Sequence, residues 1–254
     1  MSVPKPIAVF LHGLGGSSAD WTATAGKLGK SLDVRRLDLP GSAAGPHPKD
    51  GYDPASLARW VKVTLEGEKA KTFFLVGHSL GARIAGELAA LEPGRVEALV
   101  LVSPLGAIGY GLAAKLKWKA MSRRSILQSV PEATMRNASG YGFGKAGPGK
   151  EGFVKRALAA RTGPSGTDVA HAVEKSVDGI LSAAPLLERL RGTSMPLLIV
   201  AGSEDPLAPP EQSRALLKAR PDATFELLDG LGHYPMIEDP ARFATCLKKF
   251  LARS

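Results

Sequence analysis

The sequence FFLVGHSLGARI, which runs from Phe73 to Ile84, decides how the rest of the chain is interpreted. An apolar run comes first, then Gly77-x-Ser79-x-Gly81, then a run rich in alanine and leucine that is typical of a helix. A strand, a sharp turn that carries serine, and a helix together form a nucleophile elbow. The two glycines are needed because side chains there would collide with the neighbouring strand and helix. The amide groups at the start of the helix would point at a developing oxyanion.

Short apolar runs alternate with helix-forming stretches along most of the chain, which predicts a parallel sheet with right-handed crossovers. The expected strands are residues 7–11, 32–39, 73–76, 96–103, 196–202 and 224–228. Helices are expected to begin near residues 20, 54, 80, 210 and 240. The alternation stops between residues 105 and 191, where we find helical patches and a glycine-rich loop at 137–152. We therefore expect a helical insertion over the sheet.

Reactive side chains follow three of the expected strands. Ser79 follows the first of these strands, Asp205 follows the second and His233 follows the third. We expect these side chains to meet, because functional groups gather at the carboxyl ends of parallel strands. A serine hydroxyl becomes a good nucleophile when an imidazole takes its proton. A carboxylate then holds the imidazole in the right tautomer and stabilises its charged form.

The chain contains four other histidines that compete for the role of base. His12 and His78 flank a glycine-rich loop and the serine, but their backbone positions direct the side chains elsewhere. His47 and His171 lie in loop and lid-like sequence and are expected to be solvated. His233 is preferred, since its glycine and proline neighbours place it in a loop directly after a strand.

The acid also has competitors in the sequence. Glu204 is adjacent to Asp205 and could take the same role. Asp239 precedes Pro240 and is expected to be a helix N-cap instead. No acid follows the strand that ends at Ser103, which removes another common position of the acid and favours Asp205.

Four segments resemble the landmarks of the α/β-hydrolase family, and they are HGLGG at 12–16, GHSLG at 77–81, GSEDP at 202–206 and Gly232-His233. The order serine, acid, histidine is also that of this family. The chain is similar to the cap-bearing members that include simple esterases. The resemblance implies an α/β-hydrolase fold with about six mostly parallel strands, because the family's first two strands have no counterpart here. It also implies an oxyanion hole made of the backbone amides of Leu14 and Leu80.

The same resemblance implies a division of the chain. Residues 1–104 and 192–254 would form the hydrolase core, and residues 105–191 a helical cap inserted after the family's sixth strand. The implied function is a serine carboxylesterase for small to medium acyl chains. The alternatives are a carbon–carbon bond hydrolase, a lactonase, a thioesterase or a cofactor-free perhydrolase, and a receptor without catalysis. Serine at position 79, instead of aspartate, argues against haloalkane dehalogenases and epoxide hydrolases.

Composition places limits on the remaining possibilities. The 254 residues are 44% hydrophobic, which suffices for one well-buried core. Cys246 is the only cysteine, so no internal disulfide forms, and it is expected to be packed. The sequence starts without the apolar region of a signal peptide and has no apolar run long enough to span a membrane, so we expect a cytoplasmic location. No cluster of His, Cys and carboxylates has metal-ligand spacing, and neither a metal nor a cofactor is expected.

The net charge of +9 is concentrated in part of the expected insertion. Residues 115–161 contain eleven lysines and arginines against two acids, Glu132 and Glu151, an excess equal to the net charge of the whole chain. One interpretation is a solvated helix face. The other is attraction of something anionic, such as an acidic carrier protein, a carboxylate-bearing ester or a lipid surface. Nucleic acid is not an expected partner, because aromatic residues are sparse and no binding motif is present.

Overall fold

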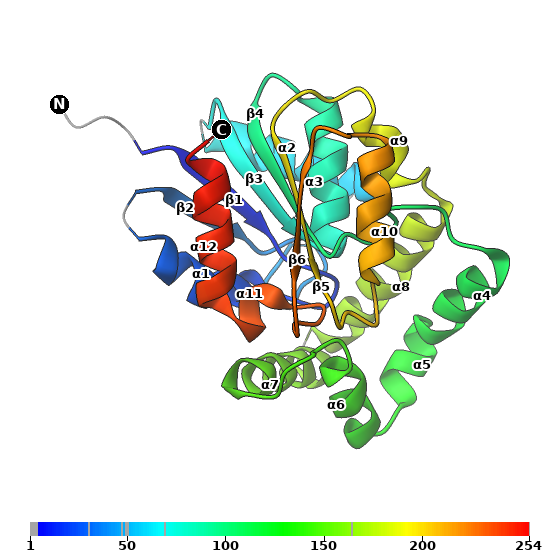
Figure 1. The fold of residues 1–254 in the computed structure, drawn as a ribbon. Coiled ribbons are helices and arrows are strands. Elements are labelled where there is room, and N and C mark those ends of the chain that lie inside the picture. Colours follow the sequence, from blue (N-terminus) through cyan, green and yellow to red (C-terminus); the bar gives the residue numbers. More distant parts are fainter. Residues whose placement is uncertain are drawn as a thin grey trace.

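The computed structural model describes residues 5–29, 31–46, 48, 51–68, 70–163 and 165–253, so His47 lies outside the described residues. Six strands form one parallel sheet in the order β2-β1-β3-β4-β5-β6 (Figure 1). They are β1 (Ile7–Leu11), β2 (Asp33–Leu37), β3 (Phe73–His78), β4 (Val96–Val102), β5 (Leu197–Gly202) and β6 (Thr224–Leu228). The α/β-hydrolase sheet of about six strands predicted from the sequence is confirmed.

The winding of the sheet reverses beside its first strand. Strand β1 pairs with β2 on one side and with β3 on the other. In an open parallel sheet, ligands bind at such a switch point, outside the carboxyl ends of the strands. Leu11 lies opposite Gly77 in the register of β1 and β3. The glycine-rich loop after β1 and the elbow after β3 therefore begin side by side.

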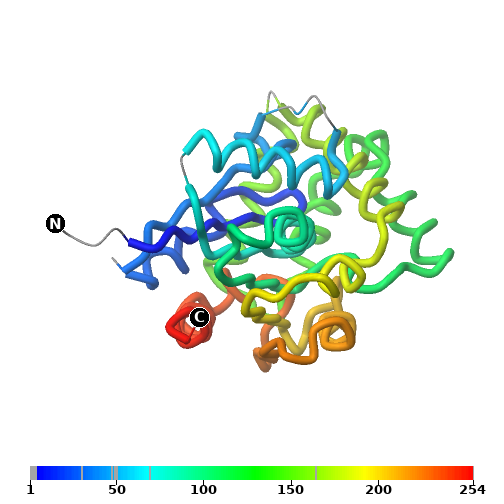
Figure 2. The backbone as a smooth tube through the Cα atoms, turned by 90° about the horizontal axis from the view of Figure 1, so that it is seen from above, coloured from blue at the N-terminus to red at the C-terminus, as the bar shows by residue number. Residues whose placement is uncertain are grey.

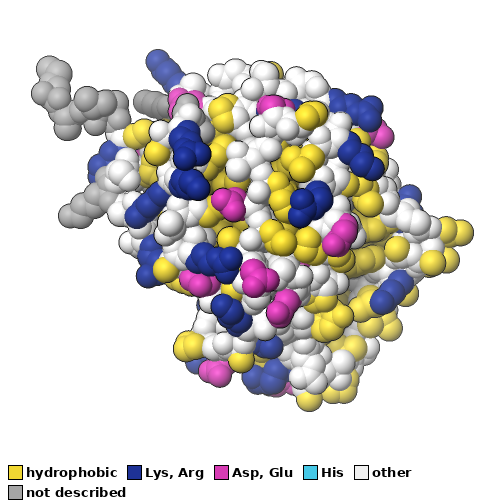
Figure 3. All heavy atoms as spheres, viewed as in Figure 1, with side chains coloured by type: hydrophobic (Ala, Val, Ile, Leu, Met, Phe, Trp, Pro, Cys, Tyr) yellow, Lys and Arg dark blue, Asp and Glu magenta, His cyan; other side chains and the backbone are white. Residues whose placement is uncertain are grey.

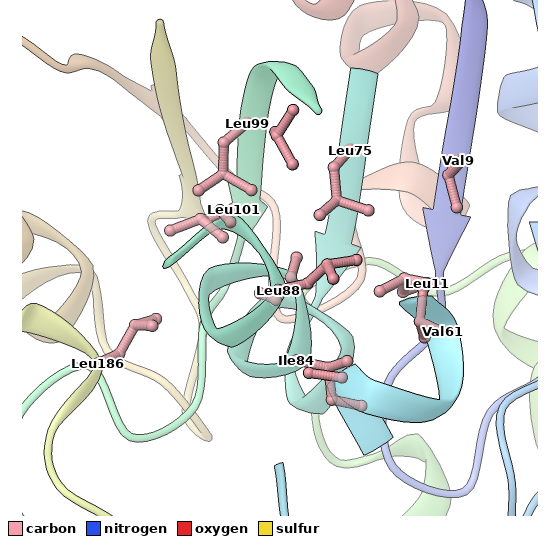
Figure 4. Close-up of a cluster of buried hydrophobic side chains, with 14 of the residues drawn as sticks. Val9, Leu11, Val61, Leu75, Ile84, Leu88, Leu99, Leu101 and Leu186 are labelled. Carbon is pink, nitrogen blue, oxygen red and sulfur yellow. The ribbon is translucent and has the colours of Figure 1, made fainter. Parts of the chain in front are cut away.

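Alternate residues of each strand face opposite sides of the sheet and build two cores. Val9, Leu75 and Leu99 pack with α2 (Pro54–Gly67) and α3 (Leu80–Leu91) on one face, and Figure 4 shows this cluster. The other face packs against α1 (Thr22–Leu28) and α12 (Pro240–Leu251). Figure 2 shows α2 in cyan and α12 in red on opposite sides of the sheet. Full burial of each such side chain contributes roughly 1.5–3 kcal/mol.

The remaining helices fall into two groups. Near the core are the short elements η1 (Ser18–Trp21), α10 (Pro210–Arg214), η2 (Ala215–Lys218) and α11 (Pro235–Glu238). Between β4 and β5 lie α4 (Leu112–Met121), α5 (Arg124–Ser129), α6 (Glu132–Gly140), α7 (Pro148–Thr162), α8 (Gly166–Ser182) and α9 (Leu186–Leu190). The segment between these strands is therefore helical, as the sequence indicates, and Figure 1 shows α6 and α7 beyond the carboxyl ends of the strands.

The predicted bounds of the glycine-rich loop, 137–152, are wrong at both ends. Helix α6 continues to Gly140, and α7 already begins at Pro148. Proline suits the first position of a helix, because its fixed φ is helical and its missing N–H has no partner there. Burial of Phe153 and Val154 then stabilises the helix against the low propensity of its glycines. Gly149 has a packing role, since a side chain there would come within 2.7 Å of the Ile237 carbonyl oxygen.

The end of the helical segment packs on the main core. Ile180 of α8 and Leu186 and Leu190 of α9 belong to the cluster that contains α3. The domain boundaries expected at 104 and 192 stay a prediction. Cys246 of α12 is half-buried against the second core, as expected, and burial raises the pKa of its thiol to about 11. Among the described residues, no helix combines the length and the apolarity needed to cross a membrane.

We predict that Leu75→Ala lowers the free energy of unfolding by about 2–5 kcal/mol, because Leu75 of β3 is fully buried in the cluster that contains α3 and its truncation leaves a cavity. Urea denaturation followed by circular dichroism measures this change. The control is Val63→Ala, since Val63 is 64% exposed on α2 and its truncation should change the free energy by no more than about 0.5 kcal/mol. Equal losses in the two variants would contradict the placement of the core.

Candidate active site

Ser79 occupies a strained turn between β3 and α3. Its φ is 56° and its ψ is −114°, and Ser103 is the other non-glycine residue with positive φ in the described part of the chain. The Ser79 amide donates to the Val102 carbonyl at 2.9 Å, which anchors the turn to β4. A side chain on Gly77 would overlap the backbone of Gly81. The glycines of the elbow are therefore required by close approach, as predicted.

Ser79, His233 and Asp205 lie in one continuous hydrogen-bonded chain. His233 Nε2 is 3.0 Å from Ser79 Oγ, and His233 Nδ1 is 2.8 Å from Asp205 Oδ2. The carboxylate can only accept, so Nδ1–H donates to Asp205 and the serine hydroxyl donates to Nε2. All three residues are at most 4% exposed. The structure thus brings together the three side chains that the sequence places after three different strands.

The buried Asp205 carboxylate is held on both of its oxygens. Oδ1 accepts from the backbone amides of Leu207 at 2.9 Å and Ala208 at 2.8 Å, while Oδ2 faces His233. These bonds replace the water that the charge loses on burial. Glu204, the competing acid, is exposed and does not contact His233 within the described contacts. Asp239 accepts from the Arg242 amide at 3.0 Å and caps α12, as expected.

Glu238 holds the loop of His233, and the sequence analysis missed it. Oε1 accepts from the amides of Gly232 and Tyr234, both at 3.1 Å, so the residues on each side of His233 are bound. Oε2 accepts at 2.9 Å from the amides of Gly144 and Lys145, in the connection between α6 and α7. The signal that could have found it is a carboxylate five residues after the histidine, in a segment opened by Pro235.

The other histidines have structural roles. His12 Nε2 accepts from the Leu39 amide at 3.0 Å and Nδ1–H donates to Gly13 O at 2.8 Å. His78 Nε2–H donates to the His233 carbonyl at 2.7 Å. Burial lowers the pKa of His12, and burial together with the nearby His233 ring lowers that of His78 well below its usual value, so both are neutral. His171 is half-buried beside Tyr52 instead of fully solvated.

The loop after β1 lies directly against the serine. A side chain on Gly13 would come within 3.0 Å of Ser79 Cβ, so the backbone can approach only because residue 13 is glycine. Leu14 follows in this loop, and Leu80 is the first residue of α3, where helix amides have no partner within the helix. Among the described residues, neither the Leu14 nor the Leu80 amide forms a backbone hydrogen bond outside regular elements. Their role as an oxyanion hole is a proposal developed below.

An apolar chamber of about 250 Å³ adjoins this loop. The helical segment supplies most of its wall, and its lining includes Leu14, Leu127, Met135, Phe153, Val169 and Tyr234. A second space of about 340 Å³ lies beside it and shares Gly15 and Phe153 with it. There the buried Asp20 carboxylate pairs with Arg156 of α7 at 2.8 Å. Within the described residues, no group of three or more His, Cys, Asp and Glu could hold a metal ion.

Residues 8–245 match the profile of the alpha/beta hydrolase family. The chain belongs to that family. It is 28% identical over 258 residues to RutD of Pseudomonas syringae, for which carbamate hydrolysis is the proposed activity, and the match covers 97% of this chain and 94% of RutD. It is 28% identical over 262 residues to the pimeloyl-[acyl-carrier protein] methyl ester esterase of Nitrosospira multiformis, covering 96% and 94%.

The fold is also shared with solved structures. A thermophilic esterase from Thermogutta terrifontis superposes with a TM-score of 0.84 at 19% identity, over 100% of this chain and 91% of that chain. At this identity the likeness shows the α/β-hydrolase fold alone. The relatives differ in the substrates that their names give, so membership of the family leaves the substrate of this hydrolase to be argued from its own site.

We predict that Glu238→Ala slows the reaction of Ser79 with a fluorophosphonate probe by about tenfold or more, because loss of the bonds to four backbone amides lets His233 shift from the serine. The second-order labelling rate measures this effect. The matched control is Glu151→Ala, which removes an exposed carboxylate from α7 and should leave the rate unchanged. A rate equal to that of the wild type in both variants would show that Glu238 does not position His233.

We predict that acidification from pH 7.5 to 5.5 destabilises the protein through its buried neutral histidines. The unfolded chain binds protons near pH 6.5, whereas His12 and His78 resist protonation when folded, so stability falls as the pH drops below about 6.5. Each group contributes at most about 1.4 kcal/mol per pH unit. Urea denaturation of the wild type and His78→Gln at several pH values tests this, and the variant should show the shallower slope. Identical slopes would contradict the assignment for His78.

Proposed function

We propose that this hydrolase cleaves carboxylic esters of small to medium acyl chains, with Ser79 as nucleophile, His233 as general base and acid, and Asp205 as the group that orients the imidazole. The observation that supports the proposal is the unbroken hydrogen-bonded chain of these side chains at the switch point of the sheet. A hydroxyl bonded to a neutral imidazole, which is in turn bonded to a buried carboxylate, is the arrangement that activates serine for attack on an acyl carbon.

In the first half of the reaction, Ser79 Oγ attacks the ester carbonyl while His233 Nε2 takes the hydroxyl proton. Nδ1–H stays bonded to Asp205, whose charge stabilises the imidazolium that forms. The carbonyl oxygen becomes an oxyanion and accepts from the amides of Leu14 and Leu80. The close approach of Gly13 to Ser79 supports this placement, because it brings the loop of Leu14 against the nucleophile.

The oxyanion then collapses and the bond between the acyl carbon and the alcohol oxygen breaks, while His233 donates its proton to the leaving alcohol and the acyl group remains on Ser79. The second half of the reaction follows. Water then enters, gives a proton to Nε2 and attacks the acyl carbon, and the same two amides stabilise the second oxyanion. Collapse of this intermediate returns the proton from Nε2 to Ser79 Oγ and releases the acid. No group outside this set is needed to balance either half.

The size and lining of the chamber support an acyl group of limited length. Pockets that bind drug-sized ligands usually measure about 300–1,000 Å³. The chamber beside Leu14 measures about 250 Å³, and its lining is mainly apolar. Transfer of a hydrocarbon chain from water into this chamber would be favourable, whereas transfer of a charged chain would be unfavourable.

Other acyl compounds could undergo the same attack, and the relatives' names include both an ester and a carbamate. Thioesters and lactones are open to the same chemistry. A receptor with an unused triad is the alternative from another class. Comparing these substrates on one enzyme preparation separates the possibilities. The cytoplasmic location and an anionic partner of the basic residues stay predictions.

We predict measurable hydrolysis of p-nitrophenyl esters, with a rate that rises and then falls along the series from two to twelve acyl carbons. Ser79→Ala should abolish covalent turnover, and Asp205→Asn should lower kcat by about 10⁴ because the imidazole is then held in the wrong tautomer. Initial rates of the wild type and both variants measure this. A carbamate, a thioester and a lactone of matched size are assayed in parallel. Faster turnover of one of these would reassign the substrate, and no rate on any would favour the receptor.

A further inference from the structure

Exposed hydrophobic side chains concentrate in one short segment of the molecule. Among the described residues, nine large hydrophobic side chains are exposed, and five of them lie between residues 108 and 126, namely Ile108, Leu112, Leu116, Met121 and Ile126. Leu112 is 75% exposed and Leu116 is 61% exposed. Single exposed leucines are ordinary, but five exposed hydrophobic residues in one short segment are not, and exposed apolar surface of this kind is found at interaction sites.

Helix α4 carries two members of this group, Leu112 and Leu116, on one face. None of its ten described residues is fully buried, and its inner side is marked by the half-buried Trp118, which lines a small space together with Leu105 and Ile180. Leu112 and Leu116 are four residues apart and therefore share a face turned away from Trp118. Figures 1 and 2 place α4 and α5 at the edge of the molecule, and Figure 3 shows hydrophobic atoms at the right-hand margin where α4 lies in Figure 1.

Basic residues border the apolar face on both sides. Residues 108–126 contain no acid, and their five basic residues are Lys115, Lys117, Lys119, Arg123 and Arg124. By helical geometry, Lys115 and Lys119 lie on one side of the two leucines and Lys117 lies on the other. All three lysines are exposed. Two neighbouring leucines flanked by lysines suit a membrane interface, where the leucines can enter the acyl boundary while the lysines reach the phosphates.

We propose that α4 and α5 dock this protein on an anionic lipid bilayer. Charge complementarity favours this occupant, since each lysine or arginine near an anionic surface contributes to binding. A second copy fits poorly, because a two-fold interface through this face would set its basic residues against themselves, and of these five Arg123 pairs with Glu174 at 3.0 Å. Leu127, next to Ile126 on α5, lines the apolar chamber beside Leu14. An ester dissolved in the bilayer would then lie near the chamber. This consequence rests on the proposed function, but the proposed docking on the bilayer does not depend on it.

The test is sedimentation of the full chain with vesicles of phosphatidylcholine alone or mixed with phosphatidylglycerol. We expect binding to the anionic vesicles, much weaker binding to the neutral ones, and release at 1 M salt, where the Debye length falls to about 3 Å. The double variant Leu112→Ser with Leu116→Ser should weaken binding by about tenfold or more. Lys115→Gln with Lys119→Gln should weaken it by about tenfold as well.

Matched controls are Val63→Ser with Leu91→Ser, which changes two exposed hydrophobic residues elsewhere, and Lys248→Gln with Lys249→Gln. Both should bind as the wild type does, and circular dichroism checks that all variants are folded. The proposal is overturned if the wild type does not sediment with anionic vesicles, or if the variants of α4 and the controls bind equally. It is also overturned if light scattering shows a dimer that the leucine variant dissociates. None of these readouts depends on hydrolysis.

Discussion

The backbone at Ser79 is the constraint on which the rest of the site depends. A φ of 56° is unfavourable for serine, and the turn persists because β4 binds its amide and because two glycines let β3, α3 and β1 come close. The same turn fixes the start of α3, whose first amide belongs to Leu80. The backbone conformation of Ser79 therefore sets three features together. These are the position of the hydroxyl, the direction of the helix dipole and the approach of the loop after β1.

Charge burial is the second requirement, and the site meets it with backbone amides. Asp205 is 4% exposed and would be costly to bury alone, but two amides and the His233 ring satisfy its oxygens. His12 and His78 avoid a buried charge altogether. Burial lowers the pKa of each ring, so each ring stays neutral while it forms hydrogen bonds with backbone groups. Among the described residues, His233 is the histidine that contacts both Ser79 and a carboxylate.

Much of this arrangement could be predicted from local patterns, and the remainder could not for a physical reason. Strand β1, the elbow and the meeting of Ser79, Asp205 and His233 follow from apolar runs, from glycine spacing and from the rule that parallel strands end at one edge. The role of Glu238 was missed because two of the amides that it binds, those of Gly144 and Lys145, are more than ninety residues away in sequence. The loop at 137–152 was placed wrongly because propensity favours a loop there, whereas burial of Phe153 decides for a helix.

The helical segment between β4 and β5 is tied to the core at points that also serve the site. Arg83, four residues after Ser79, is fully buried and pairs with Glu87 at 2.6 Å. It also donates to the Ala184 carbonyl, between α8 and α9. At the other end, Glu238 binds the loop of His233 and the connection between α6 and α7 with one carboxylate. A displacement of α6 and α7 would therefore also move the loop of His233, because both are bound to the Glu238 carboxylate. The position of the chamber wall and the position of His233 are coupled through Glu238, so the segment that lines the apolar chamber also takes part in holding the imidazole.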